Sequence, residues 1–532
     1  MKNRILRAGT LLALVPASLA LADTTATTTQ AYQGYVDDLT QLVESNREDV
    51  HAMIRLGVML RQLGRHGEAE KVLAEAAILE PNLNRLLNPG ALADGPCTDC
   101  GRSVGADVIV GDLNGIGNYT SSGPINGQLA FSVGTTSCNL GTVPLTWFQN
   151  TNAHPVIAQN MFRLMNGRFE QIGMSHLKHG FCALQQGLCG ACSPVGGGCE
   201  QWLGVGCSDP YSASLNGDQG NLGPRNEVNA WTASYPWPFT FRTIDSNLSR
   251  RLVVNASDLN PTNNPGALYF VEGMYVDDDD AAAGNNMNNA SYRRIIPNWN
   301  TSFGTVSSVS FSGSTQRQKA AIQAWQDNDA TVTIVNADAP NDGRFIIGYK
   351  VTNNGNGTWT YEYAVQNMNS DRSAQAFSVG APDPTTLTNI GFHDIFYHSW
   401  DGHQSSFGNQ RNYDGTDWAS THTGGKITWA TNTFANDPNA NAIRWGTLYN
   451  FRFTSNGAPV ARPATINLFK PGVGGDSVSV SVMGPACVLD GDVSGDQIVN
   501  FNDLNIVLSG YGTTYGFAHL NQVLSQFGQS CL

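Results

Sequence analysis

The stretch Phe345-Ile-Ile-Gly-Tyr-Lys-Val-Thr352, followed by Asn353-Asn-Gly-Asn-Gly357 and Thr358-Trp-Thr-Tyr-Glu-Tyr-Ala-Val-Gln-Asn367, predicts two β-strands joined by a tight turn. In the second strand, large apolar or aromatic side chains alternate with smaller or polar ones, which gives one buried face. Those large residues are Trp359, Tyr361, Tyr363 and Val365. Asn and Gly fill the turn because they accept backbone conformations that other residues avoid. The stretch therefore predicts an antiparallel hairpin.

Further strand-like runs lie on both sides of this hairpin. Their spacing is typical of a β-sandwich, in which two antiparallel sheets share one core. We expect a helix at Thr315–Asp327 to interrupt the pattern. The prediction is therefore an antiparallel β-sandwich domain over residues 301–483. Its additional strands are expected at Ala330–Asn336, Ala376–Gly380, Thr447–Phe453, Thr465–Phe469 and Ser477–Met483.

The preceding region, residues 106–300, has shorter apolar runs broken by Gly, Asn and Pro, which predict a β-rich domain. Its strands are expected at Val108–Val110, Leu129–Val133 and Val143–Phe148, and its brief helices at Pro155–Met165 and Asp277–Arg294. The run Asp277-Asp-Asp-Asp280 has two interpretations. It is an exposed acidic helix start, which the helix dipole favours, or a second calcium site. The predicted fold class is mainly β, with a helical N-terminal prefix and a small helical tail.

The first 22 residues have the pattern of a secretory signal peptide. Lys2, Arg4 and Arg7 precede the apolar run Ala8–Leu21, and small residues at Ala20 and Ala22 predict cleavage after Ala22. No later stretch reaches the roughly 18 apolar residues that a membrane span needs. We therefore expect a secreted or cell-surface protein with no transmembrane segment.

The chain is acidic, with a formal net charge of −13. Loss of the three basic residues in the signal peptide lowers that charge further. An acidic chain without a basic stripe is a poor partner for nucleic acid, whose phosphates attract Lys and Arg. This excludes nucleic-acid binding from the expected functions.

Ten cysteines occur in the chain, among them the CxxC pair Cys97 and Cys100. Such pairs suit a zinc site, but thiols outside the cytosol oxidise, so export favours disulfides. Five of the cysteines lie in 182–207, a segment rich in Gly and Ser that has little apolar content of its own. We expect disulfide bonds to hold this segment in shape.

Residues 50–83 have small and large packing positions in the register of a helical hairpin, at Leu56, Gly57, Leu60, Ala69, Leu73, Ala76 and Pro81. This pattern resembles one tetratricopeptide repeat. A single repeat does not bury its own apolar face, so the resemblance implies a helical prefix over 30–83 that docks on another part of the chain. A peptide-binding groove is the alternative. Residues 84–105 are expected to form a linker.

The C-terminal region contains Asp490-Gly-Asp-Val-Ser-Gly-Asp-Gln-Ile-Val-Asn-Phe-Asn-Asp503. Oxygen-bearing groups fall at the first, third, fifth, seventh, ninth and twelfth positions of a loop, the spacing of an EF-hand type calcium site. Most of these ligands are side chains, and the seventh is a backbone carbonyl. The predicted Ca²⁺ ligands are Asp492, Ser494, Asp496, Ile498, Asn500 and Asp503.

This loop and the apolar run Leu504–Leu508 after it resemble the first half of a dockerin module. The resemblance covers residues 487–532 and implies Ca²⁺ binding, a disulfide between Cys487 and Cys531, and attachment to a cohesin-like or cell-surface partner. Two features depart from the family. Gly510–Cys531 contains no acidic residue for a second loop, and Gln497 occupies the position where such loops usually have Gly.

The chain has only ten histidines, and several of them gather in two groups. One group contains His154, His176 and His179, and the other contains His393 and His398 with Asp394. His176 and His179 form an HxxH pair, which shares one face of a helix but not of a strand. If the groups meet between the two β-rich domains, they bind a transition metal such as Zn²⁺ or Cu²⁺. Otherwise the histidines serve as hydrogen-bonding groups of the core. The candidate ligands are His154, His176, His179, His393, Asp394 and His398.

Three function classes remain open from the sequence. The first is an exported extracellular or cell-surface protein with a calcium-binding attachment tail and a ligand-binding β-rich body, with carbohydrate, in particular polysaccharide, as the ligand class. The second is an exported enzyme, either a metal-dependent oxidase or hydrolase or a glycoside hydrolase. No nucleophile elbow and no identifiable carboxylate pair supplies its catalytic residues. The third is a structural surface scaffold.

Overall fold

The computed structural model describes residues 102–196, 199–402 and 411–531, together with isolated residues between Val36 and Glu75. The chain separates into two compact units, Met1–Cys100 and Gly101–Leu532. The expected signal peptide, most of the linker, and Cys97 and Cys100 lie outside the described residues.

The first unit is helical at the positions that are described. Leu56, Gly57, Leu60 and Ala69 are in helical conformation and buried. Leu73, Ala76 and Pro81 lie outside the described residues. The similarity to a tetratricopeptide repeat stays a prediction.

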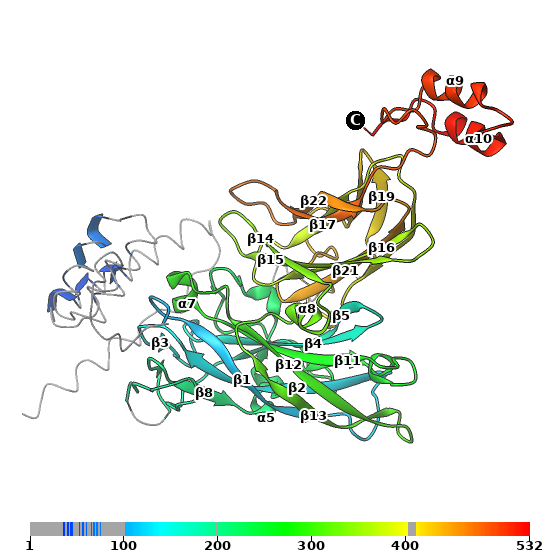
Figure 1. The fold of residues 1–532 in the computed structure, drawn as a ribbon. Coiled ribbons are helices and arrows are strands. Elements are labelled where there is room, and N and C mark those ends of the chain that lie inside the picture. The colour runs from blue at the N-terminus through cyan, green and yellow to red at the C-terminus, as the bar shows by residue number, and fades with distance from the viewer. Residues whose placement is uncertain are drawn as a thin grey trace, which may run out of the picture. The chain divides into compact units, whose positions relative to one another are not determined.

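An eleven-stranded sheet forms the first part of the second unit (Figure 1). Its strand pairs are antiparallel. The main path, in spatial order, is β1 (Val108–Asn118), β2 (Gln128–Asn139), β10 (Leu252–Asn255), β5 (Arg168–Met174), β4 (Val156–Met165), β11 (Leu268–Val276), β12 (Ala290–Asn300) and β13 (Thr305–Gln316). The strands off this path are β6 (Leu177–His179), β8 (Ser208–Tyr211) and β9 (Leu222–Gly223).

Strand β11 of this sheet is covered by an apolar core on each of its two faces. Side chains alternate across a strand, so successive residues point to opposite faces. Phe270 and Met274 pack into one apolar core, whereas Val271 and Tyr275 pack into another. Because both faces are covered, β11 is an almost continuous apolar run rather than an alternating one.

Two five-stranded sheets form the sandwich predicted from the hairpin. The first contains β14 (Thr333–Asp338), β15 (Arg344–Asn353), β16 (Trp359–Asn367), β21 (Thr447–Ser455) and β18 (Leu387–His393). The second contains β19 (Ala419–Thr423), β20 (Lys426–Ala430), β17 (Ala374–Gly380), β22 (Pro459–Leu468) and β23 (Ser477–Pro485). Tyr361 and Tyr363 from the first sheet share a core with Phe377 and Trp429 from the second. This confirms the mainly β fold class and the antiparallel sandwich.

The apolar core that contains Phe270 of β11, which is distinct from the core inside the sandwich, joins the sandwich to the large sheet. Phe270 of β11 belongs to the same cluster as Trp325 of helix α8 (Gln323–Asn328) and Leu448 of β21. Arg168 of β5 also forms two hydrogen bonds, of 2.6 and 2.9 Å, with the carboxylate of Glu362 on β16. The two β-rich regions therefore pack as one body.

Three of the predicted helices differ from the structure. Pro155–Met165 is strand β4 over most of its length, because apolar residues on both faces hide the two-residue period. Asp277–Arg294 contains only the short helix α7 (Asp278–Ala283) before β12 begins. Thr315–Asp327 starts at the end of β13, and only its last part is helical, in α8. Since β13 belongs to the large sheet, the first β-rich region extends beyond residue 300.

Disulfides hold the cysteine-rich segment, as predicted. Cys182 pairs with Cys199 and Cys192 with Cys207, while Cys189 reaches back to Cys138 of β2. A short ladder between β3 (Leu145–Thr146) and β7 (Trp202–Leu203) also ties this segment to the body. No cysteine of the described part of the chain is free. Such bonds persist in oxidising surroundings, so the protein belongs to the extracellular or cell-surface class.

The tail contains helices α9 (Phe501–Ser509) and α10 (Phe517–Ser525). Val499, Val507 and Val523 form its small core. A disulfide joins Cys487 to Cys531, which confirms the predicted pairing at the base of the tail.

The remaining short helices of the body are α5 (Ala213–Asn216) and α6 (Ala256–Leu259). Across the described residues, no helix is long and apolar enough to cross a membrane.

Candidate functional site

The predicted calcium loop brings its acidic ligands together. Carboxylate oxygens of Asp492, Asp496 and Asp503 lie within 4.8 Å of one another. Asp503 is buried, although it is charged, and it lies in the first turn of α9. The sequence spacing alone therefore located a convergent cluster of hard oxygen donors.

Backbone hydrogen bonds shape the loop around these carboxylates. Asp492 accepts hydrogen bonds from the backbone N–H groups of residues 495, 496 and 497, at 2.8 to 3.1 Å. Asp503 accepts from the N–H groups of Ser494 and Asn500, at 2.9 and 2.8 Å. Burial alone would raise the pKa of Asp503, but these donors lower it overall. The Asp503 carboxyl is therefore held in its ionised form, the form that binds a cation.

Ser494 and Asn500 contact other groups of the loop. Asn500 Oδ1 accepts from Asn502 N–H at 2.6 Å and caps α9, so the NH₂ group of this side chain faces the loop. The hydroxyl of Ser494 lies 3.2 Å from Asp492 Oδ1, and the side-chain amide of Asn500 donates to the Ile498 carbonyl at 3.4 Å. Gln497 adopts a left-handed conformation with φ of 67°. That is the conformation for which EF-hand loops use glycine at this position.

The second half of the tail contacts the calcium loop of the first half through backbone hydrogen bonds. Val499 N–H donates to Gln529 O at 3.0 Å, and Gly528 N–H returns to Val499 O at 2.8 Å. Cys531 N–H donates to Gln497 O at 3.0 Å. The chain end therefore lies along the middle of the loop as a short ribbon, next to the disulfide.

The HxxH pair is divided between two places in the body. His176 precedes β6 and His179 ends it, so an extended backbone separates their side chains. His176 meets His398, with ring centroids 5.4 Å apart, whereas His179 meets His154 at 5.2 Å. The structure thus joins one member of each predicted histidine group but does not bring all six candidate ligands together.

His154 and His179 form a buried neutral pair. His154 Nδ1–H donates to the Phe148 carbonyl at 3.1 Å, which leaves Nε2 to accept from His179 Nδ1–H at 3.0 Å. Burial lowers the pKa of His154 to about 4 and, together with His154, that of His179 to about 3. His179 Nε2 faces the backbone of Gly223, where even a Cβ atom would lie 2.5 Å away.

The second pair, His176 and His398, contacts Asp401, which is not among the candidate ligands predicted from the sequence. His176 Nε2 donates to Asp401 Oδ1 at 2.6 Å, and His398 Nε2–H donates to the Met174 carbonyl at 2.9 Å. Asp401 Oδ2 accepts from the backbone N–H of His398. Burial would raise the pKa of Asp401, but the neighbouring imidazoles lower it overall. The spacing His398-Ser-Trp-Asp401, followed by Gly402, was the available sequence indication of this turn.

His393 and Asp394 lie apart from both pairs. His393 ends β18, and its buried Nε2 has no hydrogen-bond partner in the part of the chain that the structure describes. Asp394 accepts a hydrogen bond of 2.5 Å from the side-chain amide of Asn441. Among the described residues, only aspartates form groups of three ligand atoms close enough for one metal. The single transition-metal site proposed from the sequence is therefore not formed by these six residues.

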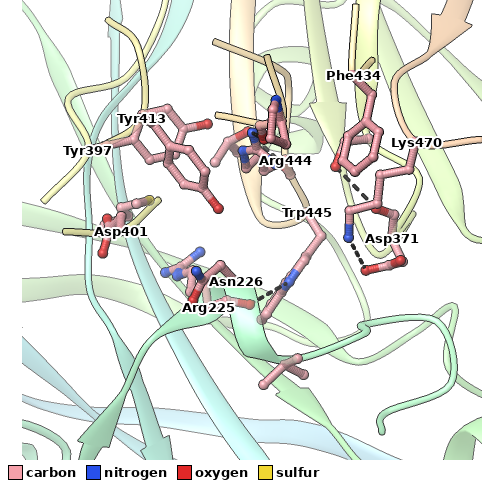
Figure 2. Close-up of a pocket in the computed structure, with 15 residues that line it drawn as sticks. Arg225, Asn226, Asp371, Tyr397, Asp401, Tyr413, Phe434, Arg444, Trp445 and Lys470 are labelled. Carbon is pink, nitrogen blue, oxygen red and sulfur yellow. Dashed lines mark hydrogen bonds and ion pairs between the residues drawn. The ribbon is translucent and has the colours of Figure 1, made fainter. Parts of the chain in front are cut away.

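A cavity of about 230 Å³ lies where the large-sheet region meets the sandwich. Figure 2 shows Tyr397 and Tyr413 on one side of it and the Lys470–Asp371 ion pair on the other. Asp401 also lines it, so the His176–Asp401 pair lies at its edge. The sequence did not indicate this cavity, because its walls come from segments more than 200 residues apart.

Arg225 and Arg444 set the character of this cavity. Arg225 is held by the carbonyls of Ser175, Gln159 and Gly446 and by Asn160 Oδ1. Burial lowers the pKa of Arg225 to about 10, which still leaves it charged at neutral pH. The guanidinium of Arg444 lies 3.8 Å from the ring centroid of Tyr413. The cavity thus combines aromatic surfaces with fixed cationic and acidic groups.

No family model matches the chain, and no curated protein shows significant similarity to it. Two solved structures are among those that can be superimposed in part. The serine-rich repeat adhesion glycoprotein Srr1 from Streptococcus agalactiae is 8% identical, with 70% of this chain and 98% of that chain covered and a TM-score of 0.18. The N-terminal domain of the Streptococcus gordonii adhesin Sgo0707 is 9% identical, with 67% and 60% covered and a TM-score of 0.15. Scores this low assign neither fold nor function, so the function follows from the chain's own geometry.

Proposed function

We propose that this protein is an extracellular or cell-surface protein whose tail binds Ca²⁺ and attaches the protein to a partner, while its β-rich body binds an external ligand. The observation that carries the proposal is the convergence of Asp492, Asp496 and Asp503. Ca²⁺ takes six to eight oxygen ligands. The loop offers three carboxylates, the Ser494 hydroxyl, the Asn500 amide oxygen and the Ile498 carbonyl.

An exposed apolar surface supports the attachment role of the tail. Phe501 is the first residue of α9 and Phe517 is the first residue of α10. They are 70% and 73% exposed. Leu508, Tyr511, Leu524 and Phe527 are also exposed. Exposed apolar groups of this density in so small a module are typical of a protein-binding surface. We propose a cohesin-like or other cell-surface protein as the partner.

The cavity in the body supports ligand binding, and we propose a saccharide unit of a polysaccharide as the ligand. Sugar rings stack on aromatic faces and hydrogen-bond to amides and carboxylates, and Tyr413, Trp445, Asn226 and Asp371 supply both kinds of group. Hydrolysis is less favoured, because a glycosidase needs one carboxyl that carries a proton. The pKa of Asp401 is lowered instead, and Asp371 pairs with Lys470.

The calcium assignment is tested by titrating the full-length exported protein after chelator treatment. Asp492→Ala and Asp503→Ala should each weaken Ca²⁺ binding at the tail by about tenfold or more, because each removes a charged ligand. They should also raise the protease sensitivity of residues 487–531. Asp490→Ala is the matched control, since Asp490 lies next to the loop but outside the ligand spacing. Unchanged titrations in both ligand variants would remove the loop assignment.

Attachment is tested with cells of the producing organism from which surface proteins have been stripped by chelator. Labelled protein should bind these cells again only with Ca²⁺, and Phe517→Asp should abolish binding while Ca²⁺ titration stays intact. Binding by Phe517→Asp equal to the unmodified protein would contradict the apolar surface. Self-assembly of the purified protein on adding Ca²⁺, seen by light scattering, would favour the scaffold alternative.

Ligand binding by the body is tested by calorimetry with soluble polysaccharide fragments. Tyr413→Ala should abolish binding, because it removes an aromatic wall of the cavity, whereas Tyr511→Ala in the tail should not change it. Release of reducing ends during the same incubation would instead support the glycoside hydrolase alternative. An equal affinity in both variants would exclude the cavity as the binding site.

A further inference from the structure

Four consecutive aspartates, Asp277 to Asp280, occupy the turn between β11 and α7. Carboxylate oxygens of Asp277, Asp278 and Asp279 lie within 4.8 Å of one another. Helix capping explains one of these oxygens, because Asp277 Oδ1 accepts from the backbone N–H groups of Asp279 and Asp280 at 3.0 and 3.2 Å. Thr146 N–H accounts for Asp279 Oδ2, so the oxygens that need a different explanation belong to Asp277 and Asp278.

Two carboxylate oxygens of this cluster are buried without a hydrogen-bond partner. Asp277 is 1% exposed, and its Oδ2 has no donor among the described residues. Asp278 is half-buried as a residue, but its Oδ1 atom is buried and also lacks a donor within this part of the chain. Among the described residues, no Lys, Arg or His forms an ion pair with Asp277 or Asp278. Buried carboxylates are ordinarily paired or bound to a metal.

Thr146 supplies an independent observation from a different element. Its backbone N–H donates to Asp279 Oδ2 at 2.7 Å, which places this residue of β3 against the cluster. Thr146 is 8% exposed, and its buried Oγ1 has no hydrogen-bond partner among the described residues. A buried hydroxyl without a partner, on a residue that contacts this acidic cluster, is expected where an ion completes the arrangement.

Electrostatics agree with this geometry. Ionised carboxylates of Asp277 and Asp278 repel each other at this separation. A divalent cation removes the repulsion and favours the ionised carboxylates.

We infer that Asp277, Asp278 and Asp279, with the hydroxyl of Thr146, bind a Ca²⁺ ion between α7 and β3. The donors are all hard oxygens and include no imidazole or thiolate, which selects against Zn²⁺ and Cu²⁺. Three carboxylates and a hydroxyl in an irregular turn suit the flexible coordination of Ca²⁺ better than the strict octahedron of Mg²⁺.

The ion ties the disulfide-bonded segment to the large sheet. Thr146 pairs with Trp202 in the β3–β7 ladder, and Trp202 lies between Cys199 and Cys207. Asp277 directly follows β11, the strand that both cores share. Calcium therefore stabilises the body independently of the tail.

The test uses the full chain carrying Asp492→Ala and Asp503→Ala, which removes the tail site and leaves the body intact. After chelator treatment this protein should still bind one Ca²⁺ in calorimetry, and Ca²⁺ should raise its melting temperature. Adding Asp278→Asn should abolish both effects. Asp417→Asn, which removes an exposed carboxylate of the body, should leave both unchanged. Failure here leaves the tail proposal standing, because the tail site is already absent.

Thr146→Val is the second variant, because it keeps the backbone N–H and all charges and removes only the hydroxyl. It should weaken Ca²⁺ binding several-fold while the near-ultraviolet circular dichroism spectrum stays that of the parent. The inference is overturned if the parent chain binds no Ca²⁺, if Mg²⁺ binds in its place, or if Thr146→Val binds Ca²⁺ as tightly as the parent. An unfolded Asp278→Asn variant would leave Thr146→Val to decide.

Discussion

Gln497 has a Cβ atom in a backbone conformation that favours glycine. Its side chain is exposed, and its backbone forms hydrogen bonds with Asp492 and Cys531. Left-handed backbone destabilises a residue with a side chain by about 1–2 kcal/mol, and glycine avoids this. The residue therefore stores strain at the sharpest point of the calcium loop.

Gln497→Gly should stabilise the tail by up to about 1 kcal/mol and tighten Ca²⁺ binding, because relief of strain outweighs the extra freedom of glycine in the unfolded chain. Calcium titration and proteolysis of residues 487–531 measure this. Gln497→Ala keeps the Cβ atom and should bring no gain. A gain of equal size in both variants would show that the side chain, not the backbone, is responsible.

Asp209 of β8 makes the stability of the body depend on pH. It is 1% exposed; Oδ1 accepts from Leu184 N–H at 2.8 Å, and Oδ2 has no partner among the residues that the structure describes. Burial raises its pKa to about 8, although the Leu184 N–H lowers it in part. The folded protein therefore holds a proton that the unfolded chain releases near pH 4.

Because that folded-state pKa is raised, this contribution to stability is present at low pH and is lost as pH rises from about 4 to about 8. Asp209→Asn cannot ionise and still offers an oxygen to Leu184. The free energy of unfolding should fall between pH 5 and pH 8 by at least about 1 kcal/mol more in the unmodified protein than in this variant. Denaturant unfolding at both values measures it. Asp245→Asn, at an exposed aspartate, should behave like the unmodified protein.

The separation of the site residues along the sequence explains which of them could be identified without the structure. The tail ligands lie within twelve residues, so spacing alone specified their convergence. His176 and Asp401 are 225 positions apart, and only the packing of two β-rich regions brings them into contact. No local pattern contains that information.

At the scale of the elements, Arg225 forms hydrogen bonds with both β-rich regions. Arg225 lies after β9 and donates to carbonyls that belong to the large-sheet region and, at Gly446, to the turn before β21. Trp445 Nε1–H returns a hydrogen bond to the Arg225 carbonyl at 3.3 Å. Removing the guanidinium leaves these acceptors buried without donors.

Arg225→Met should therefore lower the free energy of unfolding by about 3–5 kcal/mol, because it breaks a buried charged network. It should also abolish ligand binding at the cavity. Arg344→Met removes an exposed ion pair with Asp338 and should lower stability by about 1 kcal/mol or less. Chemical denaturation of both variants gives the comparison. Equal losses would mean that the arginine network does not join the regions.

Element prediction succeeded where one face of a strand is polar and failed where both faces are covered. The hairpin Phe345–Asn367 was predicted because its alternation is visible, and the structure pairs Asn353 with Trp359 next to the turn. The segment that forms strand β4 was predicted to be a helix because Val156, Ile157 and Ala158 are consecutive apolar residues and show no alternation. The structure buries all three. A strand between two cores has no polar face to reveal its period.

For the whole molecule, disulfides compensate for the poor core of the cysteine-rich segment. Reduction should expose cleavage sites within 182–207 first, because this segment has few apolar contacts apart from its bridges. The hairpin β15–β16, inside the sandwich core, should stay resistant. Limited proteolysis with mass spectrometry checks this order. Simultaneous cleavage of both regions would show that the body unfolds as one unit.

The order of the large sheet was beyond sequence reasoning altogether. In the sequence, its neighbours β5 and β10 are separated by long segments that contain β6 to β9, and its neighbours β2 and β10 by segments that contain β3 to β9. Which strands pair depends on how those stretches fold back, and their turns carry no code for distant partners. The composition predicted a β-rich region, and tertiary packing decided its order.

The Cys487–Cys531 bond, which closes a loop of 44 residues, also has a mechanical consequence. If the helices of the tail hold a partner while the body is pulled away by flow, the load enters at Cys487 and divides between both arms of the closed loop. Each arm carries part of the force, and neither can be drawn out to the full length of the module. The anchor would therefore yield over a short distance and re-form quickly when the load is released.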